Sequence, residues 1–238
     1  MEDKKKPSVY GFIFARGGSK GVPGKNIRDF NGKPLLAWTV ELAASLNIFD
    51  RIIVSTDSPD IAEVARQYGA ETPFMRPLEF ATDSAPERLA WRHAVENLPP
   101  FDIMVNLPAT APLRKPETVM RCVELIQKGD TDMVITVTPA VRHPSFNMVT
   151  LDADGYAHLL MPAAGHAVLR RQDAPSAYDM TTVCYATTPS VVLSLDRIMS
   201  GRVKPVIVGQ EEAMDIDSLV DFDVAAFLHS RRIHGDFN

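Results

Sequence analysis

The most constraining feature of this sequence lies near its N-terminus, where an apolar run passes directly into a basic, glycine-rich loop. Residues 9–15 are almost entirely apolar and predict a buried strand. The loop that follows, residues 16–26, contains four glycines and the side chains of Arg16, Lys20, Lys25 and Asn26. Glycines let backbone N–H groups turn inward around an anion, and arginine and lysine both suit phosphate. The loop therefore predicts an anion site, for which a triphosphate is the simplest ligand.

The simpler interpretation of this loop is a solvated basic turn. Three cations within ten residues, in a chain of net charge −5, favour the anion site. Two familiar phosphate motifs are excluded. In the P-loop pattern ending at Gly24-Lys25, Ser19 stands where the first glycine is required and Asn26 where serine or threonine is required. The dinucleotide pattern G-x-G-x-x-G fails because Gly17 and Gly18 are adjacent. The loop is thus a phosphate-type loop of another kind.

Strand and helix patterns alternate along most of the chain. This alternation predicts an α/β fold, with a mostly parallel sheet covered by helices on both faces. We expect ligands beyond the carboxyl ends of the strands, which is where the basic loop lies. The expected strands cover 9–15, 52–55, 103–107, 133–137, 182–186 and 205–208, and the expected helices cover 35–46, 58–68, 83–98, 116–127, 190–199 and 218–231. Asp83 or Ser84 is expected to cap the third of these helices.

The pattern changes between residues 141 and 180. Short alternating stretches at 148–151 and 158–161 flank Asp152-Ala153-Asp154-Gly155, which is a turn signal. We interpret residues 141–180 as a β-hairpin arm inserted into a single domain, residues 1–238.

Composition narrows the class of protein. The negative net charge argues against a nucleic-acid-binding protein. The apolar runs are too short to span a bilayer, so no membrane association is expected. Residues 1–6 are charged with no apolar core after them, which does not resemble a signal peptide, and a cytoplasmic protein is expected. Cys122 and Cys184 suggest neither a disulfide framework nor a metal site.

Asp215-Ile216-Asp217 is the second constellation that could carry chemistry. In an extended stretch, Asp215 and Asp217 point to the same side. Two carboxylates near a phosphate site suit Mg²⁺, which prefers oxygen ligands and shares its shell with substrate phosphates. The equal alternative is an acidic first turn of a helix, where carboxylates are favoured.

The loop resembles the opening motif of the cytidylyltransferases that activate acidic sugars, the acylneuraminate cytidylyltransferase (CMP-sialic acid synthetase) family. That motif reads approximately A-R-x-x-S-K-G-x-x-x-K-N, and it is matched by Ala15, Arg16, Ser19, Lys20, Gly21, Lys25 and Asn26. The resemblance extends to the D-I-D segment at 215–217, to Arg76-Pro77 with Asp83-Ser84, to Thr110 and Pro112–Arg114, to Arg170–Asp173, and to Tyr178 and Tyr185. It implies a three-layer nucleotidyltransferase fold with a dimerisation arm. It also implies a homodimer that uses CTP, Mg²⁺ and an acidic 2-keto-3-deoxy sugar.

The resemblance also implies roles for individual residues. Arg16, Lys25 and Asp215 are expected to be catalytic, and Asp215 and Asp217 to hold the metal. The expected sugar contacts are Thr110, Arg171, Gln172 and Tyr178. Nucleotide contacts are expected from Ala15, Arg16, Gly17, Ser19, Lys20, Lys25, Asn26, Arg76 and Ser84.

The departures from the family pattern cluster on the sugar side. Pro108 stands where the family has glutamine, Ala111 where it has serine, and Thr181-Thr182 where it often has Asn-Gly. Replacing glutamine by proline removes a hydrogen-bonding side chain and a backbone N–H. These departures suggest cytidylyl transfer to an altered acceptor. The alternatives are an enzyme acting on a 3-deoxy-octulosonate-type sugar and a non-catalytic nucleotide-binding protein on the same scaffold.

Overall fold

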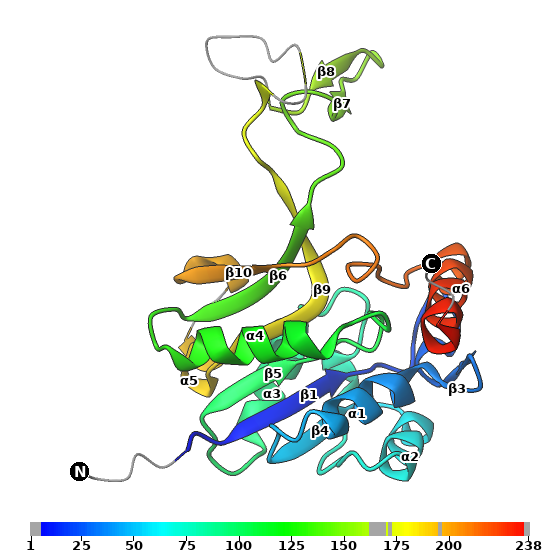
Figure 1. The fold of residues 1–238 in the computed structure, drawn as a ribbon, viewed down its shortest axis with the longest axis vertical. Helices are drawn as coiled ribbons and strands as arrows, with labels where there is room; N and C mark the ends of the chain where they lie inside the picture. Colours follow the sequence, from blue (N-terminus) through cyan, green and yellow to red (C-terminus); the bar gives the residue numbers. More distant parts are fainter. Residues whose placement is uncertain (1–5, 162–169, 171–172, 195–196, 236–238) are drawn as a thin grey trace.

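A six-stranded sheet forms the centre of the protein (Figure 1). The computed structural model describes residues 6–161, 170, 173–194 and 197–235. Strands lie in the order β10-β6-β9-β5-β1-β4. Their bounds are β1 (Val9–Phe14), β4 (Arg51–Ser55), β5 (Ile103–Asn106), β6 (Met133–Pro139), β9 (Tyr178–Thr187) and β10 (Val203–Ile207). β1 is buried along nearly its whole length, as expected for a strand covered on both faces.

The sheet is mostly parallel, as the sequence predicts, but β9 runs antiparallel to both of its neighbours, β5 and β6. The reason lies in the connection. β6 ends at Pro139, which pairs with Tyr178 at the start of β9. The chain between them leaves the sheet as the arm and returns to the same end, so the returning strand must run in the opposite direction.

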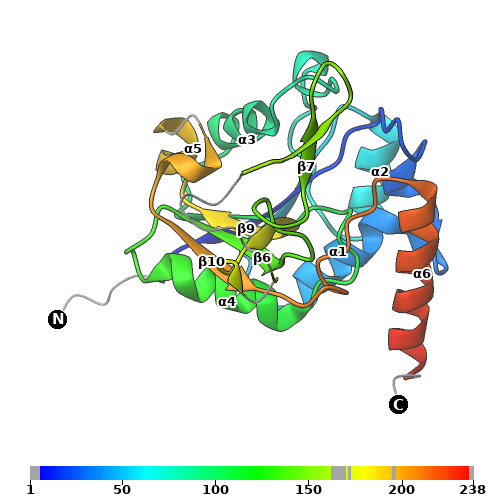
Figure 2. The same ribbon diagram turned by 90° about the horizontal axis from the view of Figure 1, so that it is seen from above.

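Helices cover the sheet in two layers (Figure 2). On one face lie α1 (Leu35–Ser45), α2 (Pro59–Gln67) and α4 (Pro116–Gln127), which share one core with Ile13 and Val105 of the sheet. On the other face lie α3 (Glu87–Glu96) and α5 (Pro189–Ser194), which pack Trp91 and Val192 against Phe12 and Met104. Two cores on opposite faces of one sheet make the three-layer α/β arrangement that the sequence predicts.

A third, smaller core lies beside the sheet. Here α6 (Leu219–His234) packs against the short strands β2 (Asp29–Phe30) and β3 (Lys33–Pro34). Its buried side chains are Val22, Phe30, Leu35, Ile216, Phe222 and Ala225. Ser218 caps α6 through a capping box with Asp221, so Asp221 shapes the start of the helix.

The arm stands out from the sheet, as Figure 1 shows. Its tip contains β7 (Val149–Leu151) and β8 (Ala157–Leu159). These two strands pair antiparallel, with Thr150 opposite His158. Gly155 closes the turn with a φ of 87°, a left-handed conformation that favours glycine. The hairpin expected within residues 141–180 is therefore present.

Two helix expectations were wrong in detail. α3 begins at Glu87, and neither Asp83 nor Ser84 caps it, because Pro86 occupies the N-cap position and the Asp83 carboxylate pairs with Arg16 and Lys20 instead. α5 ends at Ser194, and a separate 3-10 turn, η4 (Ile198–Ser200), follows it, so the helix expected over 190–199 is not continuous.

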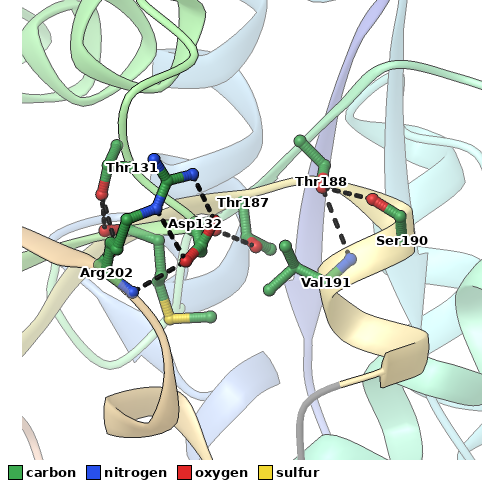
Figure 3. A network of polar contacts seen from close by, with 8 residues as sticks. Thr131, Asp132, Thr187, Thr188, Ser190, Val191 and Arg202 are labelled. Carbon is green, nitrogen blue, oxygen red and sulfur yellow. Dashed lines mark hydrogen bonds and ion pairs between the residues drawn. The ribbon is translucent and has the colours of Figure 1, made fainter.

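A polar network joins the strand ends remote from the arm (Figure 3). The Asp132 carboxylate accepts hydrogen bonds from the Arg202 backbone N–H and guanidinium, both at 2.8 Å. The Asp132 carbonyl accepts from the Thr187 hydroxyl at 2.9 Å. The Arg202 guanidinium lowers the pKa of Asp132 to about 2. These contacts fix the starts of β6 and β10 beside the end of β9. None of the described helices is long and apolar enough to cross a membrane.

Candidate active site

A cavity of about 380 Å³ opens beyond the carboxyl ends of β1 and β5, which is a suitable size for a small ligand. Segments far apart in the sequence form its walls: the basic loop, residues 76–90, the loop after β5, β9 and the D-I-D segment. Its polar lining includes Arg16, Ser19, Lys20, Lys25, Asn26, Arg76, Asp83, Glu87, Thr110, Thr182, Tyr185 and Asp217. The structure thus brings most of the expected site residues to one place.

The basic loop keeps its shape through its own backbone. Gly24 adopts a left-handed φ of 64° and starts a 3-10 turn, η1 (Lys25–Ile27). Asn26 is buried and its amide donates to the Arg16 carbonyl at 3.0 Å. These two features turn Arg16 and Lys25 toward the same cavity.

The loop is locked to the D-I-D segment by three contacts. Ile216 is fully buried in the third core, where Val22 of the loop is also buried. The Lys25 ammonium donates to the Ile216 carbonyl. Gly21 lies so close to the Asp217 carbonyl oxygen that a Cβ added at Gly21 would be 2.0 Å from it. Ile216 points into the core, and the two aspartates that flank it lie in different places. Asp217 lines the cavity, whereas Asp215, expected to be catalytic and to hold the metal, lines a neighbouring hollow; Thr182 lines both.

The two aspartates have different environments. Burial raises the pKa of Asp215, and the Asp217 charge raises it further. The hydroxyls of Thr110 and Thr182 and the charge of Lys25 lower this pKa, but by less. Asp215 Oδ1 is buried with no hydrogen-bond partner among the described residues. Asp217 is 81% exposed at its side chain, and its Oδ1 is 3.6 Å from Lys25 Nζ. A buried carboxylate oxygen without a partner beside a second carboxylate can accept a cation.

Within the described part of the chain, no three His, Cys, Asp or Glu side chains gather into a metal-binding cluster. Asp215 and Asp217 are therefore a pair, and a cation between them would need further oxygen ligands from a substrate or from water.

Arg76 also lines the cavity and is held firmly. Its backbone N–H donates to the Thr56 carbonyl at 2.8 Å, and its guanidinium donates to the Ser55 hydroxyl and carbonyl at the end of β4. Burial lowers the pKa of Arg76 to about 10, with Arg16 contributing and Asp57 and Glu87 opposing. The guanidinium remains charged at neutral pH, so a buried, fixed positive charge faces the cavity.

Asp83 occupies the mouth of the cavity between two loop cations. Its Oδ1 is 2.7 Å from the Arg16 guanidinium, and its Oδ2 is 2.5 Å from the Lys20 ammonium. These two cations lower the pKa of Asp83, with the Lys20 hydrogen bond as the largest cause.

The loop after β5 is held from beneath by Arg114. This side chain is 3% exposed and donates to the carbonyls of Pro108 and Val183. These two carbonyls tie the loop after β5 to β9, and the Thr39 hydroxyl accepts a further, longer hydrogen bond from the guanidinium at 3.4 Å. Thr110 lines the cavity, and its carbonyl accepts from the Ile216 N–H at 3.0 Å.

Sequence reasoning missed part of the cavity wall. Glu87 accepts hydrogen bonds from Asn106 and Trp91, both at 3.1 Å, and lies beside Tyr185. Burial raises the pKa of Tyr185, and the Glu87 charge adds to the effect. The sequence did contain a sign of Tyr185, because this residue fits the family's tyrosine pattern. Glu87 carried none, because an acid in the first turn of a helix is common.

Some expected site residues do not face this cavity. The Ala15 N–H donates to the Ser55 carbonyl, and the Gly17 N–H donates to Asp57 at 2.9 Å. Ser84 is not among the lining residues, whereas its neighbours Asp83 and Ala85 are. Tyr178 lines a separate hollow at the base of the arm with Arg142 and His143. Arg171 and Gln172 lie outside the described residues.

The sheet order, the three layers and a basic cavity at the strand ends define the class as an α/β nucleotidyltransferase fold. Residues 10–197 match the model of the family described as Cytidylyltransferase. The chain belongs to the cytidylyltransferase family, and the family expected from the loop motif is confirmed.

Characterised relatives match along most of the chain. It is 34% identical over 221 residues to post-translational flagellin modification protein B of Campylobacter coli, covering 91% of this chain and 92% of the relative. It is 34% identical to the CMP-N,N'-diacetyllegionaminic acid synthase of Campylobacter jejuni, covering 92% and 93%. An N-acylneuraminate cytidylyltransferase of Streptococcus agalactiae is 30% identical over 88% of this chain and 50% of its own length.

Solved structures confirm the fold. A CMP:2-keto-3-deoxy-manno-octonic acid synthetase complexed with CTP superposes with a TM-score of 0.73 at 17% identity, covering 94% of this chain and 99% of that one. A 4-diphosphocytidyl-2C-methyl-D-erythritol synthase from Anaerococcus prevotii superposes with a TM-score of 0.66 at 16% identity, covering 94% and 99%.

Proposed function

We propose that this protein transfers CMP from CTP to the anomeric hydroxyl of an acidic 2-keto-3-deoxy sugar of the nonulosonate class, such as a sialic acid, and releases pyrophosphate. The sugar oxygen forms a bond to the α-phosphorus, and the bond from that phosphorus to the bridging oxygen breaks. Pyrophosphate leaves with the electron pair of that bond, and the hydroxyl proton passes to solvent water. Relatives named for legionaminic and pseudaminic acid match 91–92% of this chain, which supports this acceptor class.

One observation carries the proposal: the basic loop and Asp217 of the D-I-D segment line a single cavity, and Asp215 is buried in the hollow next to it. Lys25 joins them, because its ammonium donates to the Ile216 carbonyl and lies 3.6 Å from Asp217. A site for anions and a site for a cation side by side suit a metal–triphosphate complex. Catalysis of this type depends mainly on positioning and on neutralising charge.

The loop cations hold the triphosphate in this proposal. Arg16 and Lys20 reach into the cavity mouth, where the leaving phosphates would lie, and Arg16 keeps its planar fork for two oxygens. Lys25 is 11% exposed at its side chain and so stays close to the reacting phosphate as a fixed charge. Arg76, which also lines the cavity, supplies a second fixed charge.

Asp215 and Asp217 fit a magnesium ion. The buried, unpartnered Asp215 Oδ1 and the exposed Asp217 carboxylate offer oxygen ligands two residues apart, and CTP would supply others. When bound, the ion neutralises phosphate charge during transfer.

The acceptor side differs from the family pattern, and the structure locates the differences. Pro108 and Thr182 both line the cavity, and Thr181 is buried with its hydroxyl donating to the Thr136 hydroxyl at 2.8 Å. We therefore assign acceptor choice to Pro108 and Thr182. The roles expected for Arg171, Gln172 and Tyr178 stay predictions.

The assembled enzyme is proposed to be a cytoplasmic homodimer in which the arm contacts a second copy. A two-stranded hairpin is marginally stable alone, and this one exposes Val149, Leu151, Tyr156, Leu160 and Met161, which are 47–69% exposed. A second copy that covers these side chains would remove that apolar surface from water.

The test is pyrophosphate release from CTP and Mg²⁺ with a panel of acidic sugars. The panel contains N-acetylneuraminate, N,N'-diacetyllegionaminate, pseudaminate and a 3-deoxy-octulosonate. Release with a nine-carbon sugar and none with the octulosonate supports the proposal. Release with the octulosonate alone would establish the alternative acceptor. CTP binding without release from any sugar would favour the non-catalytic alternative, and UTP in place of CTP tests the base preference.

A further inference from the structure

Asp83 neutralises the two most exposed cations of the candidate triphosphate site. Its two oxygens serve separate partners, Oδ1 with Arg16 at 2.7 Å and Oδ2 with Lys20 at 2.5 Å. Two oxygens that span an arginine and a lysine reproduce the contacts of a phosphate group. Asp83, Arg16 and Lys20 all line the same cavity. The carboxylate therefore lies where a phosphate of the substrate is expected.

The local fold does not require this arrangement. Asp83 does not cap α3, which begins at Glu87 without a side-chain cap. Its side chain is 40% exposed, and that of Lys20 is 84% exposed. Ion pairs between exposed side chains contribute little to stability. Asp83 is therefore easily displaced, unlike Arg76, which backbone contacts hold in place.

We propose that Asp83 is a built-in competitor for the phosphate groups, which occupies Arg16 and Lys20 between turnovers and withdraws when the triphosphate binds. This inference rests on the proposed function, because it needs Arg16 and Lys20 to bind phosphates. The carboxylate is tethered beside the two cations, so it competes at a high effective concentration. It weakens every ligand that places a phosphate there, including the pyrophosphate product, and its return helps pyrophosphate to leave.

The role of Asp83 makes a specific prediction for Asp83→Asn, which keeps the size of the side chain and removes its charge. The variant should bind pyrophosphate about 3- to 10-fold more tightly than the parent, with most of the change in a slower dissociation rate. Calorimetry and stopped-flow competition with pyrophosphate measure the two quantities. Under multiple turnover, the variant should show stronger product inhibition by pyrophosphate.

Two controls separate this effect from a general change in charge. Glu79→Gln removes an exposed carboxylate that does not line the cavity, although it lies in the 3-10 turn η2 (Leu78–Phe80) near it, and should leave pyrophosphate affinity unchanged. In a Lys20→Met background, the gain from Asp83→Asn should shrink, since one of its two partners is gone.

Pyrophosphate affinity that is unchanged or weaker in Asp83→Asn, with a thermal melt like the parent's, would overturn the inference while leaving the phosphate site intact. If the parent protein itself binds neither pyrophosphate nor CTP, the proposed function fails, and the inference fails with it. Tighter binding that appears equally in Glu79→Gln would also overturn the inference, because the cause would then be net charge.

Discussion

Lys25 is the residue at which the two halves of the site meet. Its ammonium donates to the Ile216 carbonyl and is 3.6 Å from Asp217, and its side chain is 11% exposed. Lysine usually keeps its charge in water, so this degree of burial needs compensation from nearby oxygens. Lys25 therefore both positions the D-I-D segment and adds a fixed charge to the cavity.

Lys25→Ala should lower kcat by about 100-fold or more, the size of loss seen when a fixed electrostatic contact to the transition state is removed. Steady-state pyrophosphate release measures this. Lys128→Ala, on an exposed lysine at the end of α4, is the control and should keep the parent rate. A rate in Lys25→Ala within twofold of the parent would contradict the role given to Lys25.

Gly21 and Gly18 offer a matched pair in the same loop. A Cβ at Gly21 would be 2.0 Å from the Asp217 carbonyl oxygen, so Gly21→Ala must push the loop away from the D-I-D segment. Gly18 has no atom within 4 Å of an added Cβ. We expect Gly21→Ala to lose most activity and to lower the melting temperature, and Gly18→Ala to change neither. Equal behaviour of the two variants would show that the close approach is unimportant.

At the residue scale, the spacing of the loop cations and of the aspartate pair is local and so could be read from the sequence. The structure places the loop cations and Asp217 around one cavity and Asp215 in a neighbouring hollow, and their roles stay predictions. Sequence reasoning missed Glu87 and the pairing of Asp83 with Arg16 and Lys20, because these depend on how residues 80–90 fold back over the loop. It placed Ser84 in the site, whereas its neighbour Asp83 has the side chain that contacts the loop. Local capping rules could not show that the Asp83 side chain pairs with cations that are distant in the sequence and does not cap the helix.

At the scale of elements, α6 holds the D-I-D segment against the loop, and His229 is its buried polar residue. The ring is 6% exposed and packs against Trp38, with ring centroids 4.3 Å apart. Asn31 donates its amide to His229 Nδ1 at 3.1 Å, which requires that nitrogen to be unprotonated. Burial, helped by the Arg232 charge, lowers the pKa of His229 to about 4.

This shift predicts a pH dependence of stability. The pKa of a histidine is about 6.5 in the unfolded chain. Below that pH the unfolded state therefore binds a proton at this histidine that the folded state does not bind. Stability from His229 is therefore complete above pH 6.5 and is lost as the pH falls toward 4, by up to roughly 3 kcal/mol. Denaturant melts of the parent and of His229→Gln between pH 7 and pH 4 measure it. The difference in the free energy of unfolding between the parent and His229→Gln should become smaller as the pH falls from 7 to 4. A difference that stays constant would contradict a lowered pKa for His229.

The sequence also predicted elements unevenly. The parallel strands and the helices α1, α2 and α4 were found from their apolar patterns and, for α2, from the local cap that Ser58 provides. The direction of β9 could not be read from its residues, since it follows from the arm leaving β6 and returning beside it. The start of α3 was placed too early because Pro86 is compatible with a first helical turn, but here it precedes the helix.

At the scale of the whole molecule, the arm is the part whose apolar side chains are not buried by packing within a single chain. The strands β7 and β8 are exposed along their whole length. Leu151 is 66% exposed on β7, and Asp152 beside it pairs with His158 at 2.8 Å. A second copy would bury such a surface and so fix the arm in place.

Leu151→Asp should therefore convert a dimer into a monomer, because a buried charge without a partner is costly at an apolar interface. Sedimentation velocity at several concentrations measures the assembly, and circular dichroism checks the fold. Val220→Asp, on an exposed position of α6, is the control and should keep the dimer. A parent protein that is monomeric at all concentrations would contradict the dimer outright.

The central claim is that one cavity binds CTP with magnesium and transfers CMP to a nonulosonate. The most direct measurement is pyrophosphate release with CTP, Mg²⁺ and the acidic-sugar panel, repeated with Asp217→Asn. The account predicts release with at least one nonulosonate, dependence on added Mg²⁺, and loss in Asp217→Asn with CTP binding retained. Two results would contradict it: a rate of pyrophosphate release that does not change when Mg²⁺ is omitted or Asp217 is replaced by Asn, or no pyrophosphate release with any nonulosonate.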